Sequence, residues 1–173
     1  HFLSECNSKN TSKNIEKDHI LVCTHGRHDK CCAKFGQELA DNLRNNLKDQ
    51  QENIEVFDSS HIGGHRFAPT MIDFPSGSAY GQLTNEEIPD YLESRKQGMV
   101  YAQAYRGSVF LPTLAQVAEA YVQRFRSIKQ WNCQVKISDV ENLNDENFRC
   151  LASFKSTENL LASQTDIPDE LTF

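Results

Sequence analysis

The sequence has little positive charge and no long apolar run, and both absences limit the functions it can have. Lys and Arg number 18 against 24 Asp and Glu, which gives a net charge of −6 and argues against nucleic acid as the main partner. No apolar stretch approaches the roughly 20 residues of a membrane-spanning helix. Positive charges are scattered, so binding to an anionic membrane surface is not expected either. The composition therefore predicts a globular protein without nucleic-acid or membrane partners.

Cysteine is too sparse and too irregularly spaced for a disulfide framework. Six cysteines occur in 173 residues, and Cys31 and Cys32 are adjacent, a pairing that would be strained as a disulfide. A Cys-x-x-Cys pair, typical of thiol oxidoreductases, is absent. Residues 1–17 are polar and lack the apolar core of a signal peptide. We therefore expect reduced cysteines and a cytoplasmic location.

The chain divides into three parts by composition. Residues 1–17 are rich in Asn, Lys and Ser and are expected to be a linker or arm. Residues 18–155 carry the periodic patterns and are long enough to bury the core of one domain. Residues 156–173 are expected to be a poorly ordered tail or a docking segment.

The central part alternates short apolar runs with amphipathic patterns. Strands are predicted at 19–24, 54–57, 71–74, 131–137 and 148–154, and helices at 30–48, 84–97 and 111–127. Apolar residues at helical spacing are expected to form the buried face of the third helix: Leu114, Val117, Ala118, Tyr121 and Phe125. Strand, helix and strand with short connections favour a parallel βα unit. The pattern predicts an α/β fold of the thioredoxin-like type, with a central mixed sheet and flanking helices.

Two compact motifs hold four potential metal ligands. Cys23 ends the first predicted strand and Cys32 begins the next helix, while His61 and His65 follow the second strand as His-Ile-Gly-Gly-His. Loops at the carboxyl ends of strands in one sheet converge, so these side chains can meet. Thiolate and neutral imidazole suit zinc and iron–sulfur centres. The sequence therefore predicts a metal site made of these four residues.

Spacing alone does not select the metal. Two cysteines and two histidines suit structural zinc, and they also suit a [2Fe–2S] cluster with two thiolates on one iron and two imidazoles on the other. The His-x-x-x-His pair matches the spacing of a zinc finger, whereas the two cysteines are too far apart for one. Gly63 and Gly64 would let the backbone approach a metal or a bridging sulfide closely.

The other cysteines and histidines have different expected roles. Successive side chains on a helix diverge by about 100°, so Cys31 should point away from Cys32 and be a core or spare thiol. The remaining cysteines are expected to be small buried hydrophobic residues: Cys6, Cys133 and Cys150. His25 and His28 are expected either to hydrogen-bond to the ligands or to be polar loop residues. Arg66 is expected either to stabilise charge at the site or to be solvated.

Four segments of the sequence resemble the sucrase/ferredoxin-like family. They are Val22–Ala33, Ser59–Ala68, Pro75–Gly81 and Tyr105–Gly107, and they occur in the family's order, so the resemblance covers about residues 18–125. It implies a thioredoxin-like ferredoxin fold with a non-Rieske [2Fe–2S] cluster held by two cysteines and two histidines. The residues at the matching positions are Cys23, Cys32, His61 and His65. Family members usually carry a further N-terminal region, so the resemblance implies that this chain is a fragment or a short form.

The cluster implied by the resemblance points to one-electron transfer to a redox partner protein that the sequence does not identify. Imidazole ligands are neutral, so the potential should exceed that of an all-cysteine ferredoxin, and reduction should be coupled to proton uptake. An electron carrier is expected rather than an enzyme, and sucrase activity gains no support because glycoside hydrolysis needs two carboxylates across a sugar ring. Two alternatives stay open: a zinc-stabilised Cys2His2 binding module, and a thiol oxidoreductase that uses Cys31 or Cys32.

Overall fold

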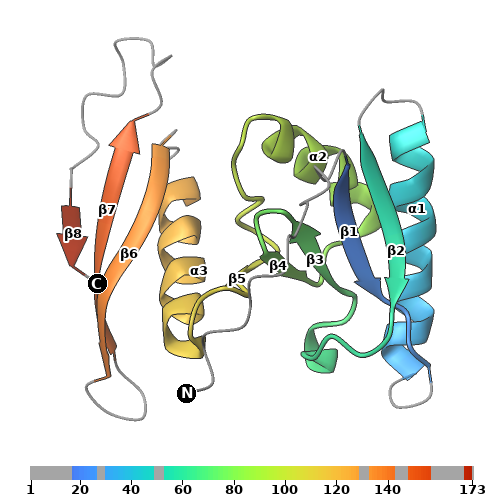
Figure 1. Cartoon of the computed structure of the whole chain (residues 1–173), viewed down its shortest axis with the longest axis horizontal. Coiled ribbons are helices and arrows are strands. Elements are labelled where there is room, and N and C mark those ends of the chain that lie inside the picture. The colour runs from blue at the N-terminus through green and yellow to red at the C-terminus, as the bar shows by residue number, and fades with distance from the viewer. Residues whose placement is uncertain are drawn as a thin grey trace, which may run out of the picture.

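The computed structural model describes residues 17–26, 30–48, 53–128, 133–142, 148–156 and 170–172. They form an α/β fold with a larger and a smaller sheet and three main helices (Figure 1). None of the helices in this described part is both long and apolar enough to cross a membrane.

The larger sheet is mixed, as the sequence predicted, and has the strand order β2-β1-β3-β4-β5. Its strands are β1 (Asp18–Cys23), β2 (Ile54–Ser59), β3 (Thr70–Phe74), β4 (Ser78–Gly81) and β5 (Tyr105–Ser108). Strands β1 and β2 are parallel, whereas the pairs β1–β3, β3–β4 and β4–β5 are antiparallel. The parallel βα unit at the start of the chain is therefore confirmed.

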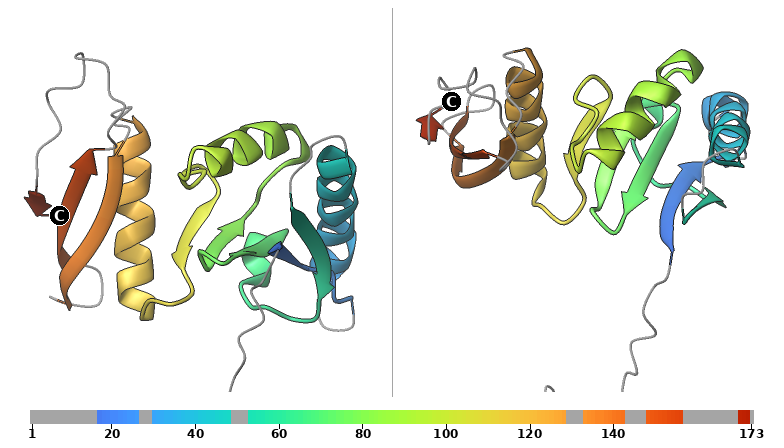
Figure 2. Two further views of the ribbon diagram at one scale, coloured as in Figure 1. Left: turned by 45° about the horizontal axis from the view of Figure 1, so that its top comes forward. Right: turned by 90° about the horizontal axis from the view of Figure 1, so that it is seen from above.

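Helices α1 (Gln37–Lys48) and α2 (Ile88–Lys96) pack on one face of this sheet. Val22 pairs with Met71 and Met71 pairs with Tyr80, so these three side chains share a face. They belong to the same buried cluster as Leu43 of α1 and Tyr91 of α2. Burial of each large apolar side chain contributes about 1.5–3 kcal/mol, so this layer supplies much of the stability. Figure 2 shows the two helices beside the strands from two further directions.

The smaller sheet contains β6 (Cys133–Asn142), β7 (Phe148–Ser156) and β8 (Glu170–Thr172), all antiparallel. Its first two strands confirm the hairpin that the sequence predicted. The third strand was not predicted, and it pairs along β7, so the last part of the chain includes a docked segment. The division into an arm, a domain and a tail stays a prediction.

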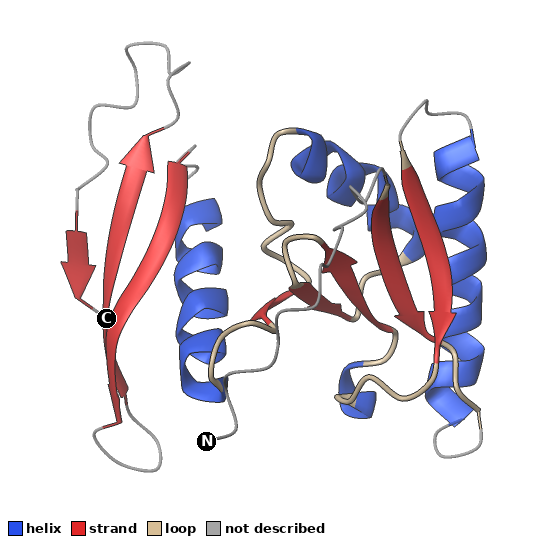
Figure 3. Cartoon of the chain, in the orientation of Figure 1, coloured by secondary structure: helices blue, strands red, loops and turns tan. Residues whose placement is uncertain are grey.

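Helix α3 (Thr113–Ile128) lies between β5 and β6 and links the two sheets (Figure 3). Its buried residues are Ala118, Val122, Gln123 and Arg126. The predicted buried face was therefore wrong for Val117 and Tyr121, which are 52% and 57% exposed. Because α3 contacts strands on two sides, its buried strip is rotated away from the apolar stripe.

The 3-10 turn Asn85–Glu87, which leads directly into α2, begins with the capping box that the sequence indicated. The Thr84 backbone N–H donates to the Glu87 carboxylate at 2.9 Å, and the Tyr101 hydroxyl donates to it at 3.0 Å. Burial acts to raise the pKa of Glu87, but the hydrogen bonds from Thr84 and Tyr101 outweigh it and lower that pKa. The ionised form is therefore the one that stabilises the fold.

We expect acid to remove this stabilisation. Because the folded-state pKa of Glu87 lies below the ordinary value of 4.5, its contribution is present above that value and is lost as the pH falls through the folded pKa. Glu87→Gln keeps a capping side chain and should flatten the loss of stability in acid, by less than about 1 kcal/mol. Glu86→Gln removes the same charge at the adjacent position and should leave the loss of unfolding free energy at low pH unchanged. Urea denaturation at a series of pH values measures both, and equal acid limbs in the two variants would contradict the assignment.

Candidate metal centre

The four predicted ligands come from segments at one end of the larger sheet. Cys23 is the last residue of β1, and its register partner Ser59 is the last residue of β2. The Thr24 N–H donates to the Ser59 carbonyl at 3.1 Å, so the two strands leave the sheet together. His61 follows two residues later, and β3 begins at Thr70 beside the same end of β1. The segments that carry Cys23 and His61 therefore leave the sheet at the same end, and the joint role of the four residues as ligands stays a prediction.

The two thiols are buried where the first helix meets β1. Cys23 is 0% and Cys32 is 1% exposed. Cys32 begins a π-helical turn (Cys32–Gly36) that runs directly into α1. At the end of this turn Gly36 packs on the Cys23 carbonyl so closely that a Cβ would overlap the oxygen and lie 3.0 Å from the carbon. The glycine thus lets the helix start against the end of the strand.

The two histidines are exposed and flank a glycine turn. Gly63 has φ 87° and Gly64 has φ 69°, which are left-handed conformations that favour glycine. A Cβ on Gly63 would meet nothing within 4 Å. The backbone conformation therefore accounts for glycine at Gly63, and the predicted approach to a metal or bridging sulfide stays a prediction. His65 then opens a 3-10 turn (His65–Phe67).

Phe67 packs the His65–Phe67 turn against the end of β4. This contact was not predicted from the sequence. The Arg106 guanidinium lies 3.7 Å from the centroid of the Phe67 ring. The Gln82 N–H donates to the Phe67 carbonyl at 2.9 Å. A Cβ on Gly81 would lie 2.9 Å from the Phe67 Cβ, so the contact needs glycine there. Gly81 and Arg106 belong to two motifs of the family resemblance, which was the only signal in the sequence for them.

The side chains of the four candidates are at one end of the sheet but not in one cluster. Among the described residues, no three His, Cys, Asp or Glu side chains gather closely enough to hold a metal ion. The cysteines are buried and the histidines exposed. Two thiols and two imidazoles fit the chemistry of a [2Fe–2S] cluster.

The neighbouring residues partly follow the expectations. Cys31 is exposed while Cys32 is buried, which confirms that their side chains diverge. Cys150 is buried, and that burial raises the pKa of its thiol, as expected of a small core residue. Cys6 and His28 lie outside the described residues, as does the side chain of Cys133. Cys23, Cys31, Cys32 and Cys150 form no disulfide.

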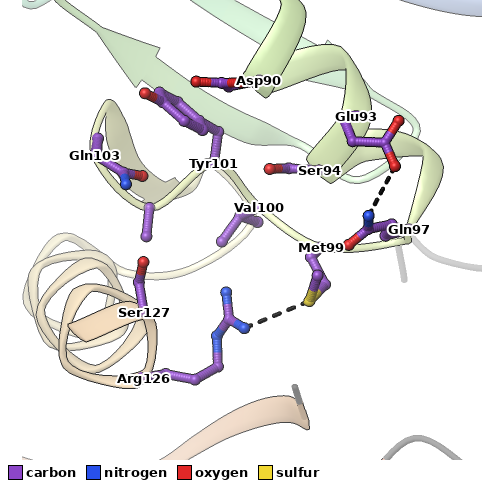
Figure 4. Close-up of a pocket in the computed structure, with 11 residues that line it drawn as sticks. Asp90, Glu93, Ser94, Gln97, Met99, Val100, Tyr101, Gln103, Arg126 and Ser127 are labelled. Atoms are coloured by element: carbon purple, nitrogen blue, oxygen red, sulfur yellow. Dashed lines mark hydrogen bonds between the residues drawn. The ribbon is translucent and has the colours of Figure 1, made fainter. Parts of the chain in front are cut away.

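A cavity of about 390 Å³ between α2 and α3 lies apart from these residues (Figure 4). Asp90, Glu93 and Arg126 are among its lining residues. Arg126 donates a hydrogen bond to the Met99 sulfur at 3.4 Å. None of the four predicted ligands lines it, so it is not part of the candidate metal centre.

Comparison with known proteins gives three findings. The model of the family described as sucrase/ferredoxin-like matches residues 1–107. "Altered inheritance of mitochondria protein 32" of Debaryomyces hansenii is 36% identical over 103 residues, which are 56% of this chain and 38% of that protein. The protein of the same name from Clavispora lusitaniae is 29% identical over 97 residues, 54% of this chain and 36% of that protein. The chain thus spans less than two-fifths of these relatives' length.

The third finding concerns the fold. A thioredoxin-like [2Fe–2S] ferredoxin from Aquifex aeolicus superposes with a TM-score of 0.51 at 18% identity, covering 57% of this chain and 96% of that chain. This similarity confirms the predicted thioredoxin-like ferredoxin fold. At such low identity this similarity is evidence for the fold alone.

These findings overturn the expected function. The sequence pointed to an electron-transfer protein with proton-coupled redox, but the curated relatives are named for inheritance of mitochondria and not as electron carriers. The expectation failed because it rested on the ferredoxin part of the family resemblance.

Proposed function

Because this chain belongs to the sucrase/ferredoxin-like family, we propose that it is a cofactor-binding domain that holds a [2Fe–2S] cluster and serves in the inheritance of mitochondria. The observation that carries the proposal is the pair of buried thiols, Cys23 and Cys32, at the sheet end from which the two histidines also extend. The fold similarity to a ferredoxin named for a [2Fe–2S] cluster supports the choice of cofactor.

The proposed ligands divide into a buried and an exposed pair. Cys23 and Cys32 would supply thiolates from the base of the site, shielded from water by α1 and the sheet. His61 and His65 would supply imidazoles from the outer side. When bound, a [2Fe–2S] cluster supplies an iron centre bridged by sulfide. The exposed histidines would leave that centre within reach of another protein.

The cellular part of the proposal rests on the relatives' name. The match covers only 38% of the Debaryomyces hansenii protein, so the role is proposed for the protein as a whole and is not assigned to the cofactor site. The name gives no compartment, and the cytoplasmic location expected from the sequence stays a prediction.

Metal analysis of anaerobically purified chain tests the cofactor. We expect iron and acid-labile sulfide in equal amounts, with visible absorbance, and loss of both in Cys32→Ser and His65→Ala. Cys31→Ser is the matched control, because this neighbouring thiol is exposed, and it should keep the full iron content. Circular dichroism checks that each variant is folded.

Each result decides one part of the proposal. Zinc without iron in the unmodified chain would contradict the cofactor. Loss of iron in Cys31→Ser but not in Cys32→Ser would contradict the ligand assignment. The cellular role is tested separately by deleting the gene: normal transmission of mitochondria to daughter cells would contradict that role and leave the cofactor unaffected.

A further inference from the structure

A second cavity, of about 380 Å³, lies between α3 and the segments around the end of β4 and the start of β5. Its lining includes Glu87, Arg106, Val117, Tyr121 and Arg124. The volume lies in the range of pockets that take small organic ligands.

One face of α3 gives this cavity its apolar wall. The lining residues of the helix are spaced three and four apart: Val117, Ala120, Tyr121 and Arg124. Val117 and Tyr121 are more than half exposed, although the sequence pattern marked both as core positions. Exposed apolar side chains that line a cavity favour a ligand with an apolar part.

Two arginines, Arg106 and Arg124, also line this cavity. Arg106 stacks on the Phe67 ring, and Arg124 donates a hydrogen bond to the Gln103 carbonyl at 3.3 Å. Within the part of the chain that the structure describes, neither forms an ion pair. By contrast, Arg44 and Arg95 are both paired with aspartates. In a chain of net charge −6, two unneutralised guanidiniums in one cavity favour an anion.

The acidic residue of the lining does not cancel this charge. The Glu87 carboxylate already accepts hydrogen bonds from the Thr84 N–H and the Tyr101 hydroxyl. One carboxylate against two guanidiniums leaves a net positive lining. The adjoining cavity of Figure 4 is different, because Asp90 and Glu93 line it beside a single arginine. The excess of positive charge is therefore confined to the cavity lined by Arg106 and Arg124 and does not extend to the adjoining one.

We propose that this cavity binds a small organic carboxylate, whose anionic group pairs with Arg106 and Arg124 and whose apolar part lies against Val117 and Tyr121. A planar guanidinium can bind a carboxylate through two parallel hydrogen bonds, which fixes the orientation of the ligand. The site uses none of the proposed cluster ligands, so this proposal can be tested separately from the proposed cofactor.

Calorimetric titration of the full chain tests the proposal, with 3-phenylpropanoate as the probe. We expect saturable binding that Arg124→Gln weakens about tenfold, the loss of one charge-assisted contact. Arg149→Gln is the matched control: it removes an exposed arginine of β7, outside the cavity, and should leave the affinity unchanged. Val117→Ser should weaken the probe without affecting the charge.

Four outcomes would contradict the proposal. The neutral amide 3-phenylpropanamide should not bind, and equal affinity for it would remove the anion requirement. Inorganic phosphate should bind more weakly, and equal affinity for it would remove the apolar requirement. Saturable binding that Arg124→Gln and Arg149→Gln change equally, or an absence of binding to the unmodified chain, would show that this cavity is not the site.

Discussion

Gly36→Ala is expected to destabilise the fold by about 3 kcal/mol or more, at the upper end of what overpacking costs. The added Cβ would overlap the Cys23 carbonyl oxygen, and no side-chain rotation can move either the Cβ or this backbone oxygen. Relief therefore requires the π-helical turn to shift away from β1, which would carry Cys32 with it. Urea denaturation followed by circular dichroism measures the loss.

Gly98→Ala is the matched control for this prediction. Gly98 follows α2 with φ 69°, and a Cβ there would meet nothing within 4 Å. Its replacement should cost only the strain of a left-handed alanine, about 1 kcal/mol. If the two alanine variants lose similar stability, the close approach of Gly36 to β1 is not what requires glycine. Iron content of Gly36→Ala would then also be expected to stay normal.

The parts of the fold with strong local signals could be predicted from the sequence. The apolar run that became β1 and the Thr84–Glu87 capping box before α2 lie within one or two residues of their predicted positions. The ends of β1 and β2 could be predicted as well, and with them the region of the candidate site. Local pattern was enough because each of these signals depends on a few consecutive residues.

Strand β5 could not be predicted because its four residues have no alternating apolar pattern. It forms because β4 offers an edge, and because Gly107 lets α3 come close: a Cβ there would lie 2.5 Å from the Gln116 carbonyl oxygen. The face of α3 was misjudged for a similar reason. Contacts with two strands decide which side is buried, and the apolar stripe does not reveal them.

The candidate site shows the same division between local and tertiary information. The ligand types and their positions near strand ends are local properties, which a sequence can reveal. The Phe67–Arg106 contact joins residues far apart in the sequence, so no spacing rule indicates it. The exposure of His61 and His65 also depends on a turn whose path the Gly63–Gly64 pair permits but does not dictate.

A buried charge network lies at the end of the sheet opposite Cys23. Asp73 of β3 is 4% exposed and accepts hydrogen bonds from the Tyr91 hydroxyl at 2.8 Å and from Arg95 at 2.9 Å. Arg95 also reaches Asp18, at the start of β1, at 2.6 Å. Burial raises the pKa of Asp73, although the donors from Arg95 and Tyr91 oppose that shift. The network connects α2 to the start of β1 and the end of β3.

Asp73→Ala is expected to cost about 3–5 kcal/mol, because it leaves a buried tyrosine hydroxyl and a largely buried guanidinium without their shared acceptor. Asp58→Ala is the matched control: Asp58 pairs with Arg44 at 2.7 Å, but its side chain is 48% exposed, and such pairs contribute at most about 1 kcal/mol. Equilibrium denaturation of both variants measures the difference, and equal losses would contradict the role of burial. Because Asp73 lies at the end of β3 away from Cys23, folded Asp73→Ala should keep the iron content of the unmodified chain.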